Sequence, residues 1–131
     1  MLLFGTIELG LMAKESASLN HFARESARVA ATGATISRIQ AHLADVASGL
    51  DADRMTTSID YRAWDEATGT WGSWTTLSDD GSQNLAYTGD QIRVHLEYSY
   101  ELATGRLLAN TLNASEDNTV TIDATIVSMR E

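Results

Sequence analysis

Three histidines are the side chains in this 131-residue sequence best suited to acid–base chemistry or metal binding. His21 and His42 fall within one predicted helical segment, where the rise per residue would place them roughly 30 Å apart. His95 lies on the polar side of a predicted strand. The sequence contains no cysteine, no G-x-S-x-G motif and no glycine-rich phosphate loop. These observations give no support to a catalytic site, and we expect neither enzymatic activity nor a bound cofactor or metal.

Two acidic loops are the remaining candidates for an ion site. One contains Asp51 and Asp53, and the other contains Asp79, Asp80 and Asn84. Calcium prefers clusters of such oxygen ligands, but neither loop has the spacing of a twelve-residue calcium loop. Calcium binding and a plain solvated turn both remain open, and the spacing favours the turn.

Three tryptophans, Trp64, Trp71 and Trp74, surround a predicted turn that contains Gly69 and Gly72. Clustered aromatic side chains can stack on sugars or on partner proteins. They can also pack across neighbouring strands, which is the more frequent arrangement. Both interpretations remain open for this segment.

The composition is that of an ordinary globular protein with an acidic surface. Hydrophobic residues make up 44% of the sequence, and the formal net charge is −9. Nucleic-acid binding requires clustered lysines and arginines, whereas the nine basic residues here are scattered. We therefore expect no nucleic acid among the partners.

Residues 1–48 are predicted to form one long helix, because helix-favouring residues dominate and the sequence contains no proline. Apolar residues recur on one helical face from Val29 to Leu50, and Gly49 is a stop signal. Such a helix would be about 72 Å long. That length exceeds the core of a small domain, so we expect residues 1–25 to project without a partner in the chain.

The pattern changes to a period of two after Asp51, which predicts strands with one apolar face. The clearest strands are 55–64, 90–101 and 119–131, with a shorter one at 73–77 and a further element possible at Leu107–Leu112. Short connections favour antiparallel pairing. The predicted fold is α+β, a long N-terminal helix (residues 1–50) packed on a small antiparallel sheet (residues 51–131). Only the amphipathic half of the helix, Val29–Leu50, is available to cover that sheet.

The apolar run Met1–Ala13 is too short to span a membrane, which requires roughly 20 residues. Left exposed, it would form an aggregation-prone patch, so lipid or other copies of the chain should cover it. Glu8 within this run is costly unless it is paired, and we expect the partner to come from another subunit. A position near the positive end of a helix is the alternative explanation.

The N-terminal region, LLFGTIELGLMAKESASLNHFARESARVAATG (residues 2–33), resembles that of TadE-like proteins of the Tad, or type IVc, pilus. The matching positions are Leu2–Gly5, Ile7–Gly10 and Ala23–Ala31, and the closing strand 119–131 is similar to the end of the family. The resemblance implies a pilin-like structural subunit of an extracellular filament on the cell surface. It also implies passage through the inner membrane before assembly, with other copies or related pilins as partners.

The residues expected to make assembly contacts come from the apolar run and from the ARESAR segment. In that segment Glu25 and Arg28 can pair along the helix, or the two arginines can meet acids of neighbouring subunits. The full set is Leu2, Leu3, Phe4, Gly5, Ile7, Glu8, Leu9, Gly10, Leu11, Met12, Arg24, Glu25 and Arg28. The alternative function is a helix-anchored periplasmic or cell-surface binding module that uses the tryptophan-rich hairpin.

Overall fold

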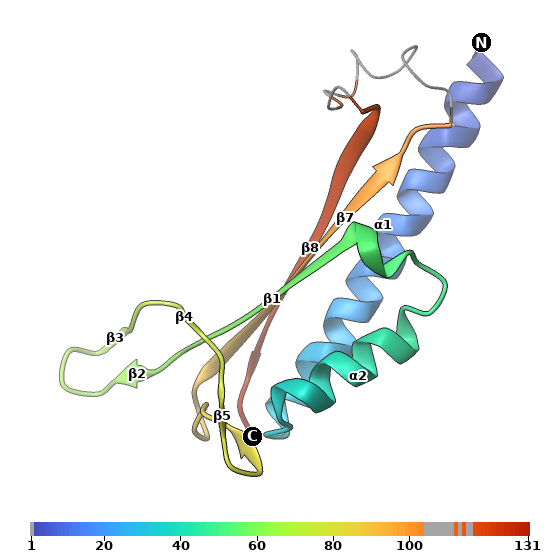
Figure 1. Cartoon of the computed structure of the whole chain (residues 1–131). Coiled ribbons are helices and arrows are strands. Elements are labelled where there is room, and N and C mark those ends of the chain that lie inside the picture. Colours follow the sequence, from blue (N-terminus) through green and yellow to red (C-terminus); the bar gives the residue numbers. More distant parts are fainter. Residues whose placement is uncertain (1, 104–111, 113, 115–116) are drawn as a thin grey trace.

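A computed structural model describes residues 2–103, 112, 114 and 117–131, and it has the α+β arrangement predicted from the sequence (Figure 1). The helices are α1 (Leu2–Ala31) and α2 (Ile36–Val46), followed by the short 3-10 helix η1 (Ala52–Arg54). The strands are β1 (Met55–Arg62), β2 (Trp64–Asp65), β3 (Thr70–Trp71), β4 (Thr75–Thr76), β5 (Asp79–Asp80), β6 (Gln83–Asn84), β7 (Gln91–Glu101) and β8 (Thr119–Met129).

The central sheet has four strands in the order β4-β1-β7-β8, and all its neighbours are antiparallel. Ile59 of β1 lies opposite Val94 of β7, which lies opposite Ile126 of β8. The alternation predicted for these strands is confirmed, since Ile92, Val94 and Leu96 are all fully buried on one face. A register shift of one residue would turn this apolar row toward solvent, so the pattern itself fixes the pairing.

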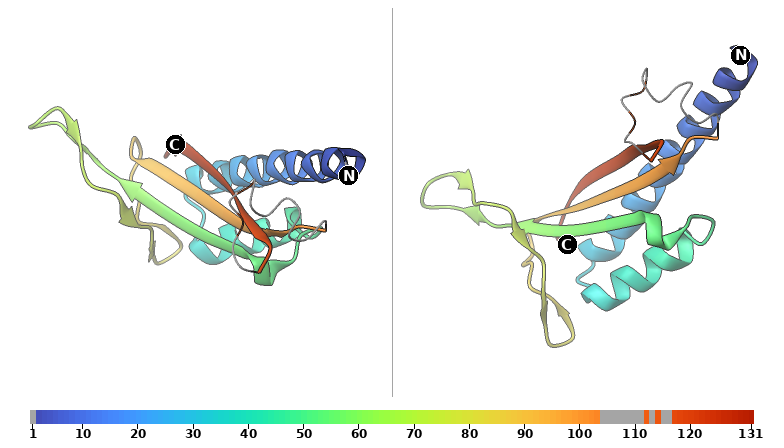
Figure 2. Two further views of the ribbon diagram at one scale, coloured as in Figure 1. Left: turned by 90° about the horizontal axis from the view of Figure 1, so that it is seen from above. Right: turned by 45° about the horizontal axis from the view of Figure 1, so that its top comes forward.

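The prediction of one continuous helix over residues 1–48 is wrong, because the chain turns sharply between α1 and α2 (Figure 2). Gly33 has a positive φ of 87°, and the guanidinium of Arg130 occupies the space where a β-carbon would lie. Thr35 then caps α2, and Asp79 accepts a hydrogen bond from the N–H of Ile36 at 2.8 Å. The absence of proline suggested a continuous helix, but a glycine with φ > 0 and a threonine cap are enough to end one helix and begin the next.

Both helices cover the apolar face of the sheet, so the expectation that only Val29–Leu50 forms this cover is wrong. The alanine side of α1, with Leu19, Ala23 and Ala27 buried, packs against β7 and β8. Ile39 and Leu43 of α2 belong to the same hydrophobic cluster. Small side chains let the backbone of α1 approach the sheet closely, which the alternating hydrophobic pattern alone did not reveal.

Two small hairpins complete the described structure. The turn predicted near Gly69 is confirmed, and it joins β2 to β3 in an arm that extends away from the body (Figures 1 and 2). The segment 78–84, predicted as a loop, instead contains the β5–β6 hairpin. Its buried Asn84 donates hydrogen bonds to the carbonyls of Ala30 and Ala34, both at 2.9 Å, and so satisfies the end of α1. The element considered at Leu107–Leu112 lies outside the described residues, apart from Leu112.

Candidate assembly surface and neighbouring sites

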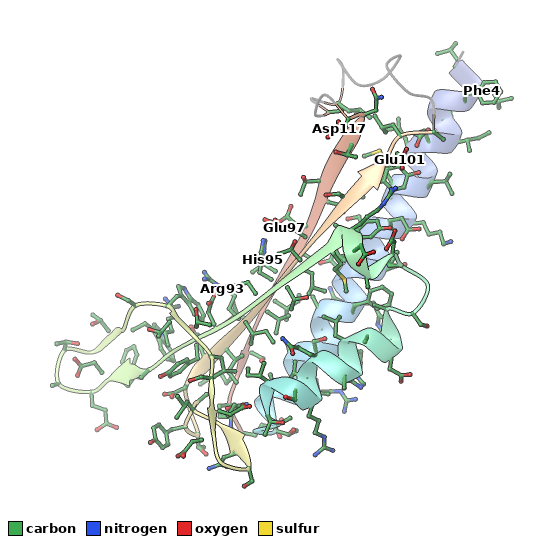
Figure 3. All side chains as sticks on the ribbon, viewed as in Figure 1. Phe4, Arg93, His95, Glu97, Glu101 and Asp117 are labelled. Carbon is green, nitrogen blue, oxygen red and sulfur yellow. The ribbon has the colours of Figure 1, made fainter. Side chains whose placement is uncertain are left out.

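The N-terminal turns of α1 form an exposed apolar tip, which Figure 3 shows at Phe4. Six large side chains are between 43% and 90% exposed, and we call this set the tip: Leu2, Leu3, Phe4, Ile7, Leu9 and Leu11. A contiguous apolar surface of this kind marks an interaction site in a soluble protein. None of the described helices is both long enough and apolar enough to cross a bilayer.

The projecting part of α1 is shorter than the predicted residues 1–25. Met12 packs against the hydrophobic cluster, and Leu19 is only 1% exposed. The earlier expectation failed because it assigned the cover of the sheet to the second half of the helix alone. Since α1 lies along β7 and β8, its packed part includes Met12 and reaches the end of β7 at Glu8.

Glu8 lies on the sheet-facing side of α1 and is 2% exposed. Its Oε1 accepts a hydrogen bond from the N–H of Ala103 at 3.1 Å, just beyond the end of β7. Tyr100 of β7 also hydrogen-bonds the Glu8 carboxylate. The expectation that another subunit must supply the partner of Glu8 is therefore wrong, because the end of β7 supplies donors within the same chain.

The contact between Glu8 and Tyr100 has a clear electrostatic consequence. Burial, followed by the hydrogen bond to Glu8 and the charge of Glu8, raises the pKa of Tyr100 to about 12. A phenolate beside a carboxylate in this partly buried place would be strongly disfavoured. The neutral phenol therefore acts as the donor and ties the base of the tip to the sheet.

The ARESAR segment occupies the middle of α1 and contains one intrachain ion pair. Arg28 donates to Glu25 at 3.0 Å, and this hydrogen bond, together with the charge of Arg28, lowers the pKa of Glu25 below its ordinary value. Arg24 is exposed and forms no ion pair with any described residue. The structure thus leaves Arg24 as the cation of this segment available to a partner.

The separation predicted between His21 and His42 does not hold, because it assumed a continuous helix. The turn at Gly33 folds α2 back along α1, and the Nε2 of His42 comes within 3.9 Å of the Glu25 carboxylate. Within the described ranges, no group of three histidine, aspartate or glutamate side chains is placed to hold a metal ion.

The outer face of the sheet carries a polar row with Arg93, His95 and Glu97, labelled in Figure 3, which agrees with the polar side predicted for His95. The contact of this row with Thr125 was not predicted. The His95 ring lies between the Thr125 hydroxyl, 2.6 Å from Nδ1, and the Glu97 carboxylate, 3.0 Å from Nε2. A hydroxyl, an imidazole and a carboxylate in this order resemble parts of a nucleophile–base arrangement. His95 and Thr125 line an open hollow of about 360 Å³ with Ser58, Asp60 and Arg93, and this hollow offers little exclusion of water.

The tryptophans of the arm pack across strands, as the second of the two interpretations predicted. Trp64 and Trp71 are register partners, with ring centroids 5.1 Å apart in an edge-to-face arrangement. Two arginines that the sequence analysis did not connect with these rings lie over them. The Cζ of Arg62 is 5.2 Å from the ring centroid of Trp71 and 4.5 Å from that of Trp74. The Cζ of Arg93 is 4.4 Å from the ring centroid of Trp74, the residue that directly precedes β4.

No protein-family model matches the chain, and neither the curated proteins nor the solved structures compared with it give a match.

Proposed function

We propose that this chain is a structural subunit of an extracellular Tad-like type IV pilus, which assembles by burying the tip of α1 against other copies. The exposure of six large apolar side chains in the N-terminal turns of an otherwise packed helix is the observation that carries this proposal. Complete burial of one such side chain is worth about 1.5–3 kcal/mol. The tip therefore supplies a sufficient driving force for association, with other copies or related pilins as partners.

The remainder of the molecule is consistent with a coat around such an assembly. The sheet and its polar outer face lie to the side of α1, and the acidic composition keeps the domain soluble. In this proposal the inner membrane covers the tip before assembly, and the filament covers it afterwards. Neither stage requires a cofactor or nucleic acid.

The test compares the intact chain with a tip-polar variant, Leu3→Gln/Phe4→Gln/Ile7→Gln. Glutamine keeps helix propensity, and these three side chains are more than half exposed, so the fold should persist. A matched control replaces exposed apolar residues elsewhere, Tyr87→Gln/Val127→Gln. We expect electron microscopy and sedimentation to show large assemblies for the intact chain and for the control, and monomers or small species for the tip-polar variant. An intact chain that stays monomeric without detergent would refute the proposal.

A second candidate is a helix-anchored surface module that binds its ligand with the arm. Its support is Trp64, which is 46% exposed beside an open hollow of about 560 Å³ that Trp71, Glu66 and Met129 help to line. Replacement of Trp64 by alanine separates the two functions. Loss of binding to a glycan or protein, with unchanged assembly, would favour the module.

A further inference from the structure

The aromatic and cationic side chains around the arm form one continuous stack. Arg93, Trp74, Arg62 and Trp71 follow one another at centroid distances of 4.4, 4.5 and 5.2 Å, and Trp64 contacts Trp71 at the outer end. Guanidinium groups thus alternate with indole rings from Arg93 to Trp71, and only Trp64 contacts another ring instead of a guanidinium. A guanidinium over the face of a tryptophan is a favourable arrangement because the ring quadrupole attracts the cation.

Each arginine inside this stack also has an oxygen partner. Asp60 accepts from Arg93 at 2.6 Å, and the Oε1 of Gln91 accepts from the Nε of Arg62 at 2.8 Å. A ring and a carboxylate also occur together at the outer end, where Trp64 and Glu66 line the same open hollow. No described basic side chain lies over Trp64, and Glu66 forms no ion pair within the described part of the chain.

We propose that the outer face of Trp64, together with Glu66, receives an arginine side chain from a second copy of this chain. The guanidinium would stack on Trp64 as Arg62 and Arg93 stack on the inner rings, and Glu66 would pair with it as Asp60 pairs with Arg93. The inference rests on the proposed function only in taking the partner to be another copy.

Charge complementarity identifies the donor surface on that second copy. Among the described basic residues, Lys14, Arg24 and Arg38 are exposed and form no ion pair. All three lie on the helices, on different elements from the arm. Arg24 and Arg38 carry the planar guanidinium that the inner stack uses, whereas Lys14 carries a compact ammonium that stacks less well. The donor is therefore Arg24 or Arg38.

A contact between the arm of one copy and a helix of the next joins two different surfaces. Such a heterologous contact does not close on itself unless the rotation happens to complete a ring, so it extends into open chains of subunits. It would add an outer contact to the apolar contact at the tip. The two contacts can be measured separately because they use different residues.

The experiment is carried out in the full-length tip-polar variant, so that association through the arm is measured with association through the tip strongly weakened. Sedimentation equilibrium at low ionic strength should show weak self-association that high salt reduces. Loss of one cation–aromatic contact should weaken this association about five- to thirtyfold. We expect that loss in Trp64→Leu, in Glu66→Arg and in one of the two variants Arg24→Glu or Arg38→Glu.

Glu66→Arg is the most informative of these changes, because it lowers the net negative charge of an acidic chain. If net charge alone controlled self-association, Glu66→Arg would strengthen it. If the proposed contact exists, Glu66→Arg weakens it. Asp123→Arg, which makes the same change at an exposed site on β8, and Lys14→Glu serve as controls that should not lose the contact. An equal mixture of the Glu66→Arg copy and the effective arginine-to-glutamate copy should restore association, since each contact is then complementary.

Three results would overturn the proposal: no self-association of the tip-polar variant at any concentration, unchanged association in Glu66→Arg, or no recovery in the mixture. Failure of the proposed function would instead appear as an intact tip that does not assemble. Because the arm variants share one tip-polar background and differ only at the arm contact, either proposal can fail while the other stands.

Discussion

Replacement of Glu8 by alanine tests the assignment of this buried carboxylate to the end of β7. The change leaves the N–H of Ala103 and the hydroxyl of Tyr100 without their common acceptor. It leaves the tip side chains in place, because Glu8 faces the sheet while they face outward. The expected effect is therefore on the stability of the junction between α1 and the sheet.

The magnitude is worked out from the hydrogen bonds that Glu8 accepts from Ala103 and Tyr100. A hydrogen bond to a charged acceptor is worth about 1.5–3 kcal/mol, and an unsatisfied buried donor costs about 1–3 kcal/mol. Ala103 is exposed and its N–H regains water, so the lower part of the range applies to it. The total loss should be about 2–3 kcal/mol, which lowers Tm by about 10 °C for a chain of this length. Glu8→Gln retains an acceptor oxygen and should lose less than half as much.

The assay is thermal unfolding of both variants in the tip-polar background, followed by circular dichroism, with amide hydrogen exchange as the local readout. Exchange should accelerate at Ala103 and along the end of β7 in Glu8→Ala, and it should change little at Ile39 in α2. A Glu8→Ala protein that melts within about 2 °C of its parent, with unchanged exchange at Ala103, would show that Glu8 does not secure this junction.

Three further perturbations test the parts of the fold that position α1. Gly33→Ala should lose about 2 kcal/mol of unfolding free energy in denaturant titrations, because φ is +87° and the new β-carbon displaces the Arg130 guanidinium. Equal stability of this variant and its parent would contradict the assignment of the helix break to Gly33. Asn84→Ala should lose about 2–3 kcal/mol by the same measurement, since the carbonyls of Ala30 and Ala34 lose their buried donor, while exposed Gln83→Ala is the control. The pKa of Tyr100 is raised to about 12 in the folded state, so its contribution to the free energy of unfolding is full below the unfolded pKa near 10 and is lost as pH rises toward 12. Tyr100→Phe should remove this part of the loss of stability at alkaline pH. Phenolate absorbance of the folded protein that appears fully near pH 10 would contradict the raised pKa.

The sheet was predictable from the sequence because its signal is local and repeated. Ile92, Val94 and Leu96 alternate with polar residues, and the same alternation at Ile122 and Ala124 defines its partner. One face must then be buried, and this requirement fixes the strands, their antiparallel pairing and the presence of a helical cover. Each of these inferences needs only the spacing of neighbouring residues.

The failed predictions about the helices and about Glu8 depended on contacts between residues far apart in the sequence. The break after α1 relies on Arg130 and Asp79, which lie far from Gly33 along the chain. One partner of Glu8 is a backbone N–H 95 residues away. No periodicity in residues 1–48 contains this information. A glycine and a capping threonine close together were the available local signal, and helix propensity outweighed them in the sequence analysis.

The arrangement of the tip around the helix axis indicates how many neighbours it needs. At about 100° per residue, the exposed tip side chains cover an arc of about 220°, and Glu8 and Met12 occupy the remaining side toward the sheet. A single partner helix covers a stripe much narrower than this arc. Burial of the whole tip therefore requires contacts from at least two neighbouring copies, so we expect species larger than dimers. Cross-linking of the intact chain should give trimers and higher species in succession, and a product that stops at the dimer would show that one side of the tip remains exposed.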